Sequence, residues 1–133
     1  MSENVDFVRS IYADWERGDF SKDAWAAPGI EFERVDGPAP GRWRGKEEIA
    51  AGIREMLSAW EGFRVIADEY REVDDERVLV LSHVIGRGKR SQMDSTQLGA
   101  TAANVFQIER GKVTRVVTYY DRDRALAESG FEE

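Results

Sequence analysis

The sequence has no cysteine and only one histidine in its 133 residues. Without cysteine there are no disulfides and no thiol chemistry, a composition typical of the reducing cytoplasm. A zinc site usually needs several Cys or His ligands, so we expect no bound metal. The sequence also contains no glycine-rich loop of the kind that holds phosphates, so we expect no cofactor.

Long apolar runs are missing as well. The longest aliphatic run, Val78 to Leu81, is far too short to cross a bilayer, and the first residues, MSENVDF, do not resemble a signal peptide. The formal net charge is −7, from 19 basic and 26 acidic residues, which argues against a nucleic-acid partner. We therefore expect a cytoplasmic protein that binds neither nucleic acid nor membrane.

What is present is enough apolar sequence, 41% of residues, for the core of a single domain covering residues 1–133. Apolar residues at helical spacing predict a helix that ends at Gly18 and a later one that ends at Gly62. A short helix capped by Ser21 and closed by Pro28 is expected between them. A last helix is expected from Asp123 to Ser129.

The rest of the chain is predicted to form strands, separated by turn residues such as Arg110-Gly111. The expected strands are Ile30 to Val35, Phe63 to Val73, Arg77 to Gly86, Thr96 to Glu109 and Val113 to Tyr120. Helices come mainly first and a long-stranded antiparallel meander follows. This order predicts an α+β fold with helices on one face of the sheet.

Two further patterns bear on function. Small residues gather at positions 24–27 and 98–103, which predicts either a cavity or close helix–sheet packing. The strands Val78 to Ile85 and Val113 to Tyr119 are apolar at both alternating sets of positions. Burial on both faces is therefore expected, with helices on one face and a second subunit of a homodimer on the other.

Three segments together resemble the SnoaL-like and ketosteroid-isomerase-like branch of the nuclear transport factor 2-like superfamily. They are VRSIYADWERGDF, RWRGKEEIAAGIREML and FQIERGKVTRVVTYYDRDRALAESG. The resemblance covers nearly the whole chain and rests on the order and spacing of the segments. It implies a cone-shaped, strongly curved antiparallel sheet wrapped around N-terminal helices, a deep apolar pocket, and a homodimer. Members of this branch differ widely in function, and some have no catalytic activity.

Asp36 is the first candidate for catalysis. It lies in the loop ERVDGPAPGRWRG, which holds all three prolines of the chain. In ketosteroid isomerases, the base is an Asp at this place, so the resemblance implies that Asp36 moves a proton next to a carbonyl. The alternative is an ordinary turn residue before Gly37. Trp43, in the same loop, would cover the pocket or simply anchor the loop.

Asn104 falls where ketosteroid isomerases carry a protonated Asp that donates to the developing oxyanion, and an amide can also donate. The alternative is a structural Asn bonded to the backbone. The first-helix Tyr of those enzymes aligns with Ile11. Tyr12 lies about 100° further around the helix and is expected to pack in the core, and Trp15 lies one turn beyond Ile11.

Asp121 ends the last predicted strand, where SnoaL-like cyclases carry an acid/base Asp, so the resemblance implies this role too. The alternative is a helix N-cap. His83 is the only histidine and is a candidate proton relay, and Gln97 and Tyr119 are further candidates for hydrogen bonds to a ligand. Core packing or surface exposure are the alternatives for these three.

Together these features predict a protein that binds a small, largely apolar molecule. Its activity would be cofactor-free acid/base chemistry on a carbonyl or hydroxyl compound, as an isomerase, cyclase or hydrolase. The alternatives are ligand binding without chemistry and a dimerisation module.

Overall fold

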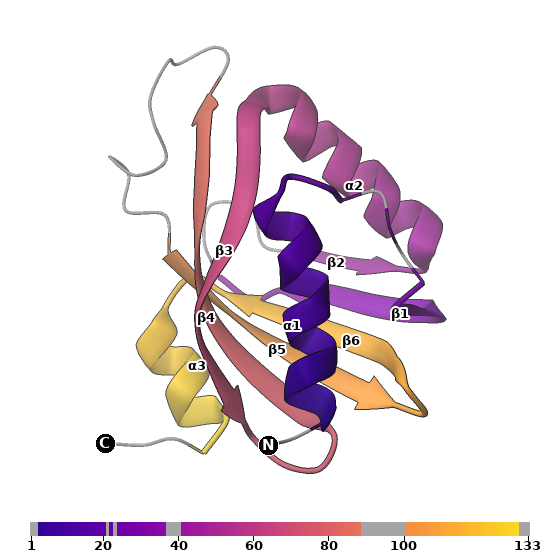
Figure 1. The fold of residues 1–133 in the computed structure, drawn as a ribbon, viewed down its shortest axis with the longest axis vertical. Helices are drawn as coiled ribbons and strands as arrows, with labels where there is room; N and C mark the ends of the chain where they lie inside the picture. The colour runs from indigo at the N-terminus through magenta and orange to yellow at the C-terminus, as the bar shows by residue number, and fades with distance from the viewer. Residues whose placement is uncertain (1–2, 21, 23, 37–40, 89–100, 131–133) are drawn as a thin grey trace.

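The computed structural model describes residues 3–20, 22, 24–36, 41–88 and 101–130. These residues form three helices and six strands, shown in Figure 1. In chain order the elements are α1 (Glu3–Glu16), β1 (Ala26–Arg34), β2 (Gly41–Arg44), α2 (Lys46–Ala59), β3 (Trp60–Glu72), β4 (Arg77–Gly88), β5 (Thr101–Glu109), β6 (Lys112–Tyr119) and α3 (Arg122–Glu128). The α+β class predicted from the sequence is confirmed.

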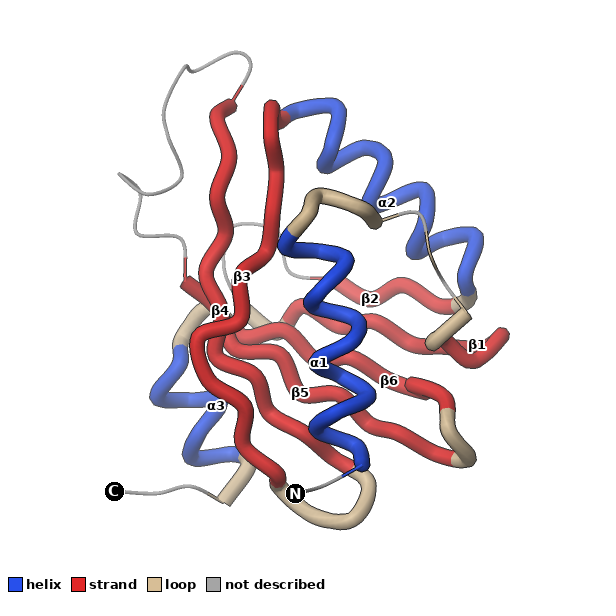
Figure 2. Tube along the Cα trace, viewed as in Figure 1, coloured by secondary structure: helices blue, strands red, loops and turns tan. Residues whose placement is uncertain are grey.

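The six strands form one open sheet in the order β2-β1-β6-β5-β4-β3. Strands β3 to β6 make the expected antiparallel meander, with the long strands β3 and β4 at one edge (Figure 2). Strand β1 pairs in parallel with β6, placing Phe32 opposite Val116. The sheet is therefore mixed, and the expectation of a wholly antiparallel sheet is corrected at this one pairing.

The larger core lies between the sheet and α1, with α2 on the same side of the sheet. Val8 and Tyr12 of α1 are fully buried against Val80 of β4 and Phe106 of β5. Ile49 of α2 packs against the edge of this core. The residues of β4 and β5 that face α1 occupy every second position, such as Val78 and Val80, as expected when one face of a sheet is covered by helices.

Helix α3 covers the opposite face of the sheet, so the expectation that all helices share one face is wrong. Ala125 of α3 packs in a second cluster with Leu79, Leu81, Val105 and Tyr119. This cluster explains why β4 and β6 are apolar at both sets of positions. Residues that suggested an interface with a second subunit are largely buried within the single chain.

The chain between α1 and α2 also differs from the expectation. Ser21 and Asp23 lie outside the described residues, and the segment from Ala26 through Pro28 is part of β1 instead of a helix. Proline is tolerated here because the pairing of β1 with β6 is irregular between Ala26 and Glu31. The short strand β2 was not predicted, and Figure 2 shows it beside β1 at the sheet edge.

Candidate functional site

A cluster of polar side chains lies in the core beneath α1, centred on Asn104. The Nδ2 atom of Asn104 donates to the hydroxyl of Tyr12 over 2.8 Å and lies 3.5 Å from the Oγ atom of Ser82. On the other side, Thr118 Oγ1 donates to Asn104 Oδ1 over 2.6 Å. One amide and three hydroxyls from α1, β4, β5 and β6 thus meet inside an apolar interior.

The positions of these side chains follow from strand pairing. Asn104 lies opposite Val80 on β4 and opposite Thr118 on β6, and residues directly opposite each other share a face of the sheet. Ser82 follows Val80 by two residues and therefore points to the same face. Sequence reasoning identified Asn104 and Tyr12 but missed Ser82 and Thr118, although the alternation of β4 could have shown that Ser82 shares the face of Val78 and Val80.

The cluster is closed to solvent. Tyr12 has no exposed surface, and Asn104 is 9% exposed. Burial raises the pKa of the Tyr12 hydroxyl above its usual value, and hydrogen bonds from Asn104 and Ser82 offset only part of this effect. The phenol is therefore neutral at physiological pH, and the cluster can offer hydrogen bonds but no charged acid or base.

Aromatic rings fill the space beside the cluster. The ring of Tyr12 lies 4.9 Å from Trp15 and 5.8 Å from Phe106, in edge-to-face arrangements. Trp15, which is half-buried, also stacks on Phe20 at 6.0 Å. Tyr12 packs in the core as expected, and Trp15 lies next to it. The pocket expected at Asn104 stays a prediction.

A hollow of about 210 Å³ lies instead at the sheet edge formed by β1, β2 and α2, and Trp43 is part of its wall. Trp43 packs edge-to-face against Phe32, with ring centres 5.8 Å apart, and the guanidinium of Arg34 lies over its ring at 5.1 Å. Arg42 and Arg115 flank the hollow and pair with Glu33. Trp43 is thus held firmly at this edge, away from the Asn104 cluster.

Asp36 lies just past the end of β1, beside the end of β6. Its Oδ1 atom accepts a hydrogen bond of 2.6 Å from the backbone N–H of Tyr120. Its Oδ2 atom is buried and has no hydrogen-bond partner among the described residues. One carboxylate oxygen of Asp36 therefore makes a structural hydrogen bond that connects the ends of β1 and β6, and the other makes no hydrogen bond within the described residues.

Asp121 is the N-cap of α3. Its side chain accepts a hydrogen bond of 3.2 Å from the backbone N–H of Arg124, and the residue is exposed. The cap satisfies one of the free N–H groups at the start of the helix. The structure thus gives Asp121 the capping contact that sequence reasoning had named as the alternative to a catalytic role.

His83 and Tyr119 lie on the α3 face of the sheet and not on the face of Asn104. His83 contacts Asp68, and the Tyr119 hydroxyl donates to Glu128 over 3.2 Å. Both side chains follow from the alternation, since Ser82 and Thr118, their chain neighbours, point to the α1 face. Gln97 lies outside the described residues.

Neither a metal site nor a membrane-spanning helix is found in the described residues. No three His, Asp or Glu side chains in these ranges gather closely enough to hold a metal ion. No helix of this part of the chain combines the length and the apolar character that crossing a bilayer requires.

Comparison with solved structures shows several chains of the same fold. An NTF2-like protein of unknown function from Burkholderia pseudomallei is 25% identical, with a TM-score of 0.75 over 96% of this chain and 97% of that one. A hypothetical protein of ketosteroid isomerase-like fold from Catenulispora acidiphila, solved in complex with trimethylamine, is 15% identical, with a TM-score of 0.71 over 98% and 95% of the two chains. TerC, co-crystallised with polyporic acid, is 20% identical, with a TM-score of 0.73 over 96% and 97%.

The sequence itself was compared with protein families and with curated proteins. No curated protein matches it significantly. The model of the SnoaL-like domain matches residues 8–116, which include most of α1, all of α2, the first five strands and part of β6. The resemblance inferred from the three sequence segments is thereby confirmed, and the chain belongs to the SnoaL-like domain family.

Proposed function

We propose that the protein binds a small, largely apolar molecule carrying a carbonyl or hydroxyl group, with Asn104 as its polar anchor, and carries out cofactor-free acid/base chemistry on it. The observation that carries this proposal is the buried cluster of Asn104 with the hydroxyls of Tyr12, Ser82 and Thr118. The reaction class would be isomerisation, cyclisation or hydrolysis.

Polar groups in an apolar core need a reason, because each must keep a hydrogen-bond partner when it leaves water. Here an amide and three hydroxyls are buried together, where apolar side chains of the same size would fill the space without that requirement. A ligand oxygen that accepted from Asn104 Nδ2 would replace the Tyr12 hydroxyl or add to it. Tyr12 would then be released to donate to the same ligand oxygen.

Small ligands in proteins of the same fold support this proposal. One solved structure is a complex with trimethylamine, and another was co-crystallised with polyporic acid. Because Tyr12 has no exposed surface, a ligand that reaches Asn104 has to open the packing around Tyr12 and Trp15. Binding should therefore change the environment of the Trp15 ring.

Asp36 is the proposed base. Its buried Oδ2 atom has no hydrogen-bond partner among the described residues and is therefore free to accept a proton. Its partner Tyr120 lies two residues beyond Thr118, about 7 Å along an extended chain, and the proposal requires a ligand that spans this separation between Asp36 and the Asn104 cluster. Arg124 of α3 also interacts electrostatically with Asp36. Asp121 is the competing candidate, with its side chain already bonded to α3.

The experiment measures hydrogen–deuterium exchange at carbon atoms next to the carbonyl in a panel of enolisable cyclic ketones, followed by NMR in D₂O. This assay detects proton abstraction without knowledge of the product. Asp36→Asn should lower the exchange rate by about 10²–10⁴-fold and leave ligand affinity, measured by tryptophan fluorescence, little changed. Asp121→Asn should leave the rate within a few fold of wild type.

Other outcomes distinguish the alternatives. Loss of exchange in Asp121→Asn alone would assign the base to Asp121 and leave Asp36 as a turn residue. Binding without exchange in the wild-type protein would indicate a ligand-binding module without chemistry. A binding-competent protein whose affinity is unchanged by Asn104→Ala would refute Asn104 as the anchor.

A further inference from the structure

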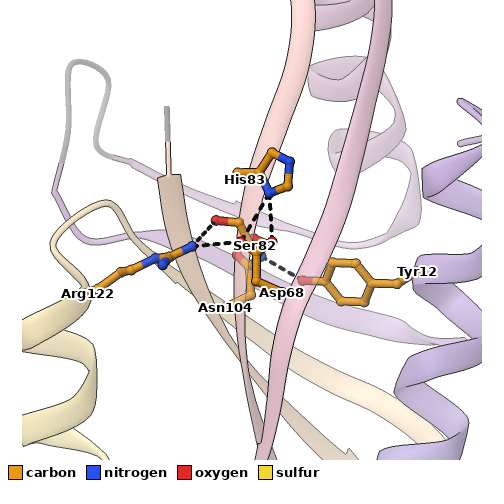
Figure 3. A network of polar contacts seen from close by, with 6 residues as sticks. All are labelled: Tyr12, Asp68, Ser82, His83, Asn104 and Arg122. Carbon is orange, nitrogen blue, oxygen red and sulfur yellow. Dashed lines mark hydrogen bonds and ion pairs between the residues drawn. The ribbon is translucent and has the colours of Figure 1, made fainter. Parts of the chain in front are cut away.

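Asp68 of β3 is held from two directions on the α3 face of the sheet. The Nδ1 atom of His83 lies 2.9 and 3.0 Å from its two carboxylate oxygens, and a guanidinium nitrogen of Arg122 lies 3.0 Å from Oδ2 (Figure 3). All three side chains are partly exposed, between 32% and 40%. Ion pairs as exposed as these usually contribute little to stability, so the interest of the cluster lies in what else it contacts.

The cluster lies at a β-bulge. Ala67 pairs with Ser82 and Glu69 pairs with Leu81, so Asp68 is an extra residue in β3. A bulge bends its strand and disrupts the regular ladder of backbone hydrogen bonds. At this place the same nitrogen of Arg122 donates to the carbonyl oxygen of Ser82 over 2.8 Å. The Nε atom of Arg122 is buried, so the guanidinium lies against the sheet.

Ser82 makes contacts on both sides of the sheet, one through its backbone and one through its side chain. Its carbonyl oxygen accepts from Arg122 on the α3 side, and its side chain, 1% exposed, points into the Asn104 cluster on the α1 side. There its Oγ atom lies 3.5 Å from Asn104 Nδ2, and its hydrogen bond to Tyr12 lowers the pKa of that phenol. Figure 3 shows the contacts running from Arg122 through Ser82 to Asn104 and Tyr12.

We infer that Arg122 is a positioning residue for the Asn104 cluster, acting through the main chain of Ser82. This inference rests on the proposed function only for the ligand that the Asn104 cluster is proposed to bind. The direction of the Ser82 side chain is fixed by its backbone, and beside the bulge Arg122 bonds this backbone at the Ser82 carbonyl. Without it, Ser82 Oγ moves relative to Asn104 Nδ2, and the 3.5 Å contact between these two atoms changes.

The test compares Arg122→Met with Arg124→Met. Both variants remove one guanidinium from α3 and keep an unbranched side chain. The Arg124 side chain bonds to Glu128 on the same helix and interacts electrostatically with Asp36 and Tyr119, which are not members of the Asn104 cluster. The readout is the NMR signal of the Asn104 side-chain amide in the ligand-free protein. Arg122→Met should shift this signal and Arg124→Met should not. Arg122→Lys, which keeps a charged donor, should restore it in part.

A third variant separates the two contacts of Arg122. Asp68→Asn removes the ion pairs and leaves the bond from Arg122 to the Ser82 carbonyl, so the Asn104 signal should stay near its wild-type position. Asp68→Asn also tests the inference if Arg122→Met does not fold. A large shift of the Asn104 signal in Asp68→Asn would then assign the effect to the ion pairs and overturn the inference.

Ligand binding adds a second measurement. With a cyclic ketone that binds the wild-type protein, Arg122→Met should weaken affinity by about tenfold, the effect of misplacing one hydrogen bond, and Arg124→Met should not. An unshifted Asn104 signal in Arg122→Met would overturn the inference whatever the ligand result. A shifted signal in a protein that binds no ligand would uphold the inference and refute the proposed function.

Discussion

Replacing Tyr12 with Phe removes one hydroxyl from the middle of the protein and changes little else. The ring keeps its contacts with Trp15 and Phe106. What is lost is the acceptor 2.8 Å from Asn104 Nδ2, in a place that water does not reach, since Tyr12 has no exposed surface. The Asn104 amide is left with Ser82 Oγ at 3.5 Å, the outer limit of a hydrogen bond.

A buried donor left without a good partner destabilises a protein by about 1–3 kcal/mol. We therefore expect Tyr12→Phe to lower the free energy of unfolding by about 2 kcal/mol at pH 7. For a chain of 133 residues this corresponds to a fall of about 6–10 °C in the melting temperature. Tyr119→Phe is the matched control. Its hydroxyl bonds to Glu128, which is exposed and stays solvated, so the loss should be below about 1 kcal/mol.

The difference in stability between wild type and Tyr12→Phe should also depend on pH. Burial raises the pKa of Tyr12 in the folded protein above the 10.0 of a free tyrosine. Above pH 10 the unfolded chain releases this proton and the folded chain keeps it. The stability from this group is thus complete below pH 10 and falls by about 1.4 kcal/mol per pH unit above it. Tyr12→Phe lacks this loss, so wild type and variant should become equally stable near about pH 11.5.

Urea unfolding of wild type, Tyr12→Phe and Tyr119→Phe between pH 7 and pH 11.5 measures both effects. Burial also raises the pKa values of Tyr70 and Tyr119, but both residues are present in wild type and in Tyr12→Phe, so their effects cancel in that comparison. A lost buried partner costs about 1–3 kcal/mol. A stability difference between wild type and Tyr12→Phe of less than about 0.5 kcal/mol at pH 7 would therefore refute the role of the Tyr12 hydroxyl as an internal acceptor. A difference that stays constant up to pH 11.5 would refute its raised pKa.

Two shorter predictions concern the helix cap and the assembly. Asp121→Ala should destabilise the protein by about 1 kcal/mol in urea unfolding, because the backbone N–H of Arg124 loses its cap, and an unchanged midpoint would contradict the capping role. An isologous homodimer is still expected from the family resemblance, with Ile85 and Tyr120, both about 40% exposed, as apolar residues available for it. Light scattering at micromolar concentration should give twice the 15.1 kDa mass of the chain, and the mass of a single chain would contradict the prediction.

Elements whose periodicity is local were predictable from the sequence. Helices α1 and α2 follow the helical spacing of their apolar residues. Helix α1 ends just before Gly18, whose positive φ angle favours glycine, whereas α2 ends at Ala59 and the expected stop, Gly62, lies within β3. The turn between β5 and β6 is formed by Arg110 and Gly111 with φ angles of 55° and 76°. These features depend on a few neighbouring residues, so a single sequence contains enough information to predict them.

The faces of the strands near the site were harder to predict, because β-bulges shift the alternation. Gln107 pairs with Arg115 but Ile108 pairs with Val113, so Thr114 is an extra residue in β6. In a regular ladder continuing from Ile108 and Val113, Asn104 would lie opposite Val117; with the bulge at Thr114, the partner is Thr118. This one residue decides which of the side chains on β6 joins the cluster, and nothing in its local sequence marks it.

Asn104 and Tyr12 were both named from the sequence, but their direct bond was not. It joins residues 92 positions apart, and it depends on how α1 lies across the sheet. The roles of Asp36 and Asp121 were left as alternatives, and the structure shows that each accepts a backbone hydrogen bond. A turn or cap contact and a catalytic role use the same residue type, so composition and spacing cannot separate them.

The parallel pairing of β1 with β6 also sets the order in which the molecule can be assembled. Asp36 and Tyr120, which close this pairing, lie 84 positions apart. Strands β3 to β6 each pair with the next strand along the chain and can form first, whereas β1 pairs with β6, the last of the six strands in chain order. On the ribosome, β1 and β2 emerge early as a two-stranded ribbon that is marginally stable alone. Their stable incorporation into the sheet thus comes only after β6 has been synthesised.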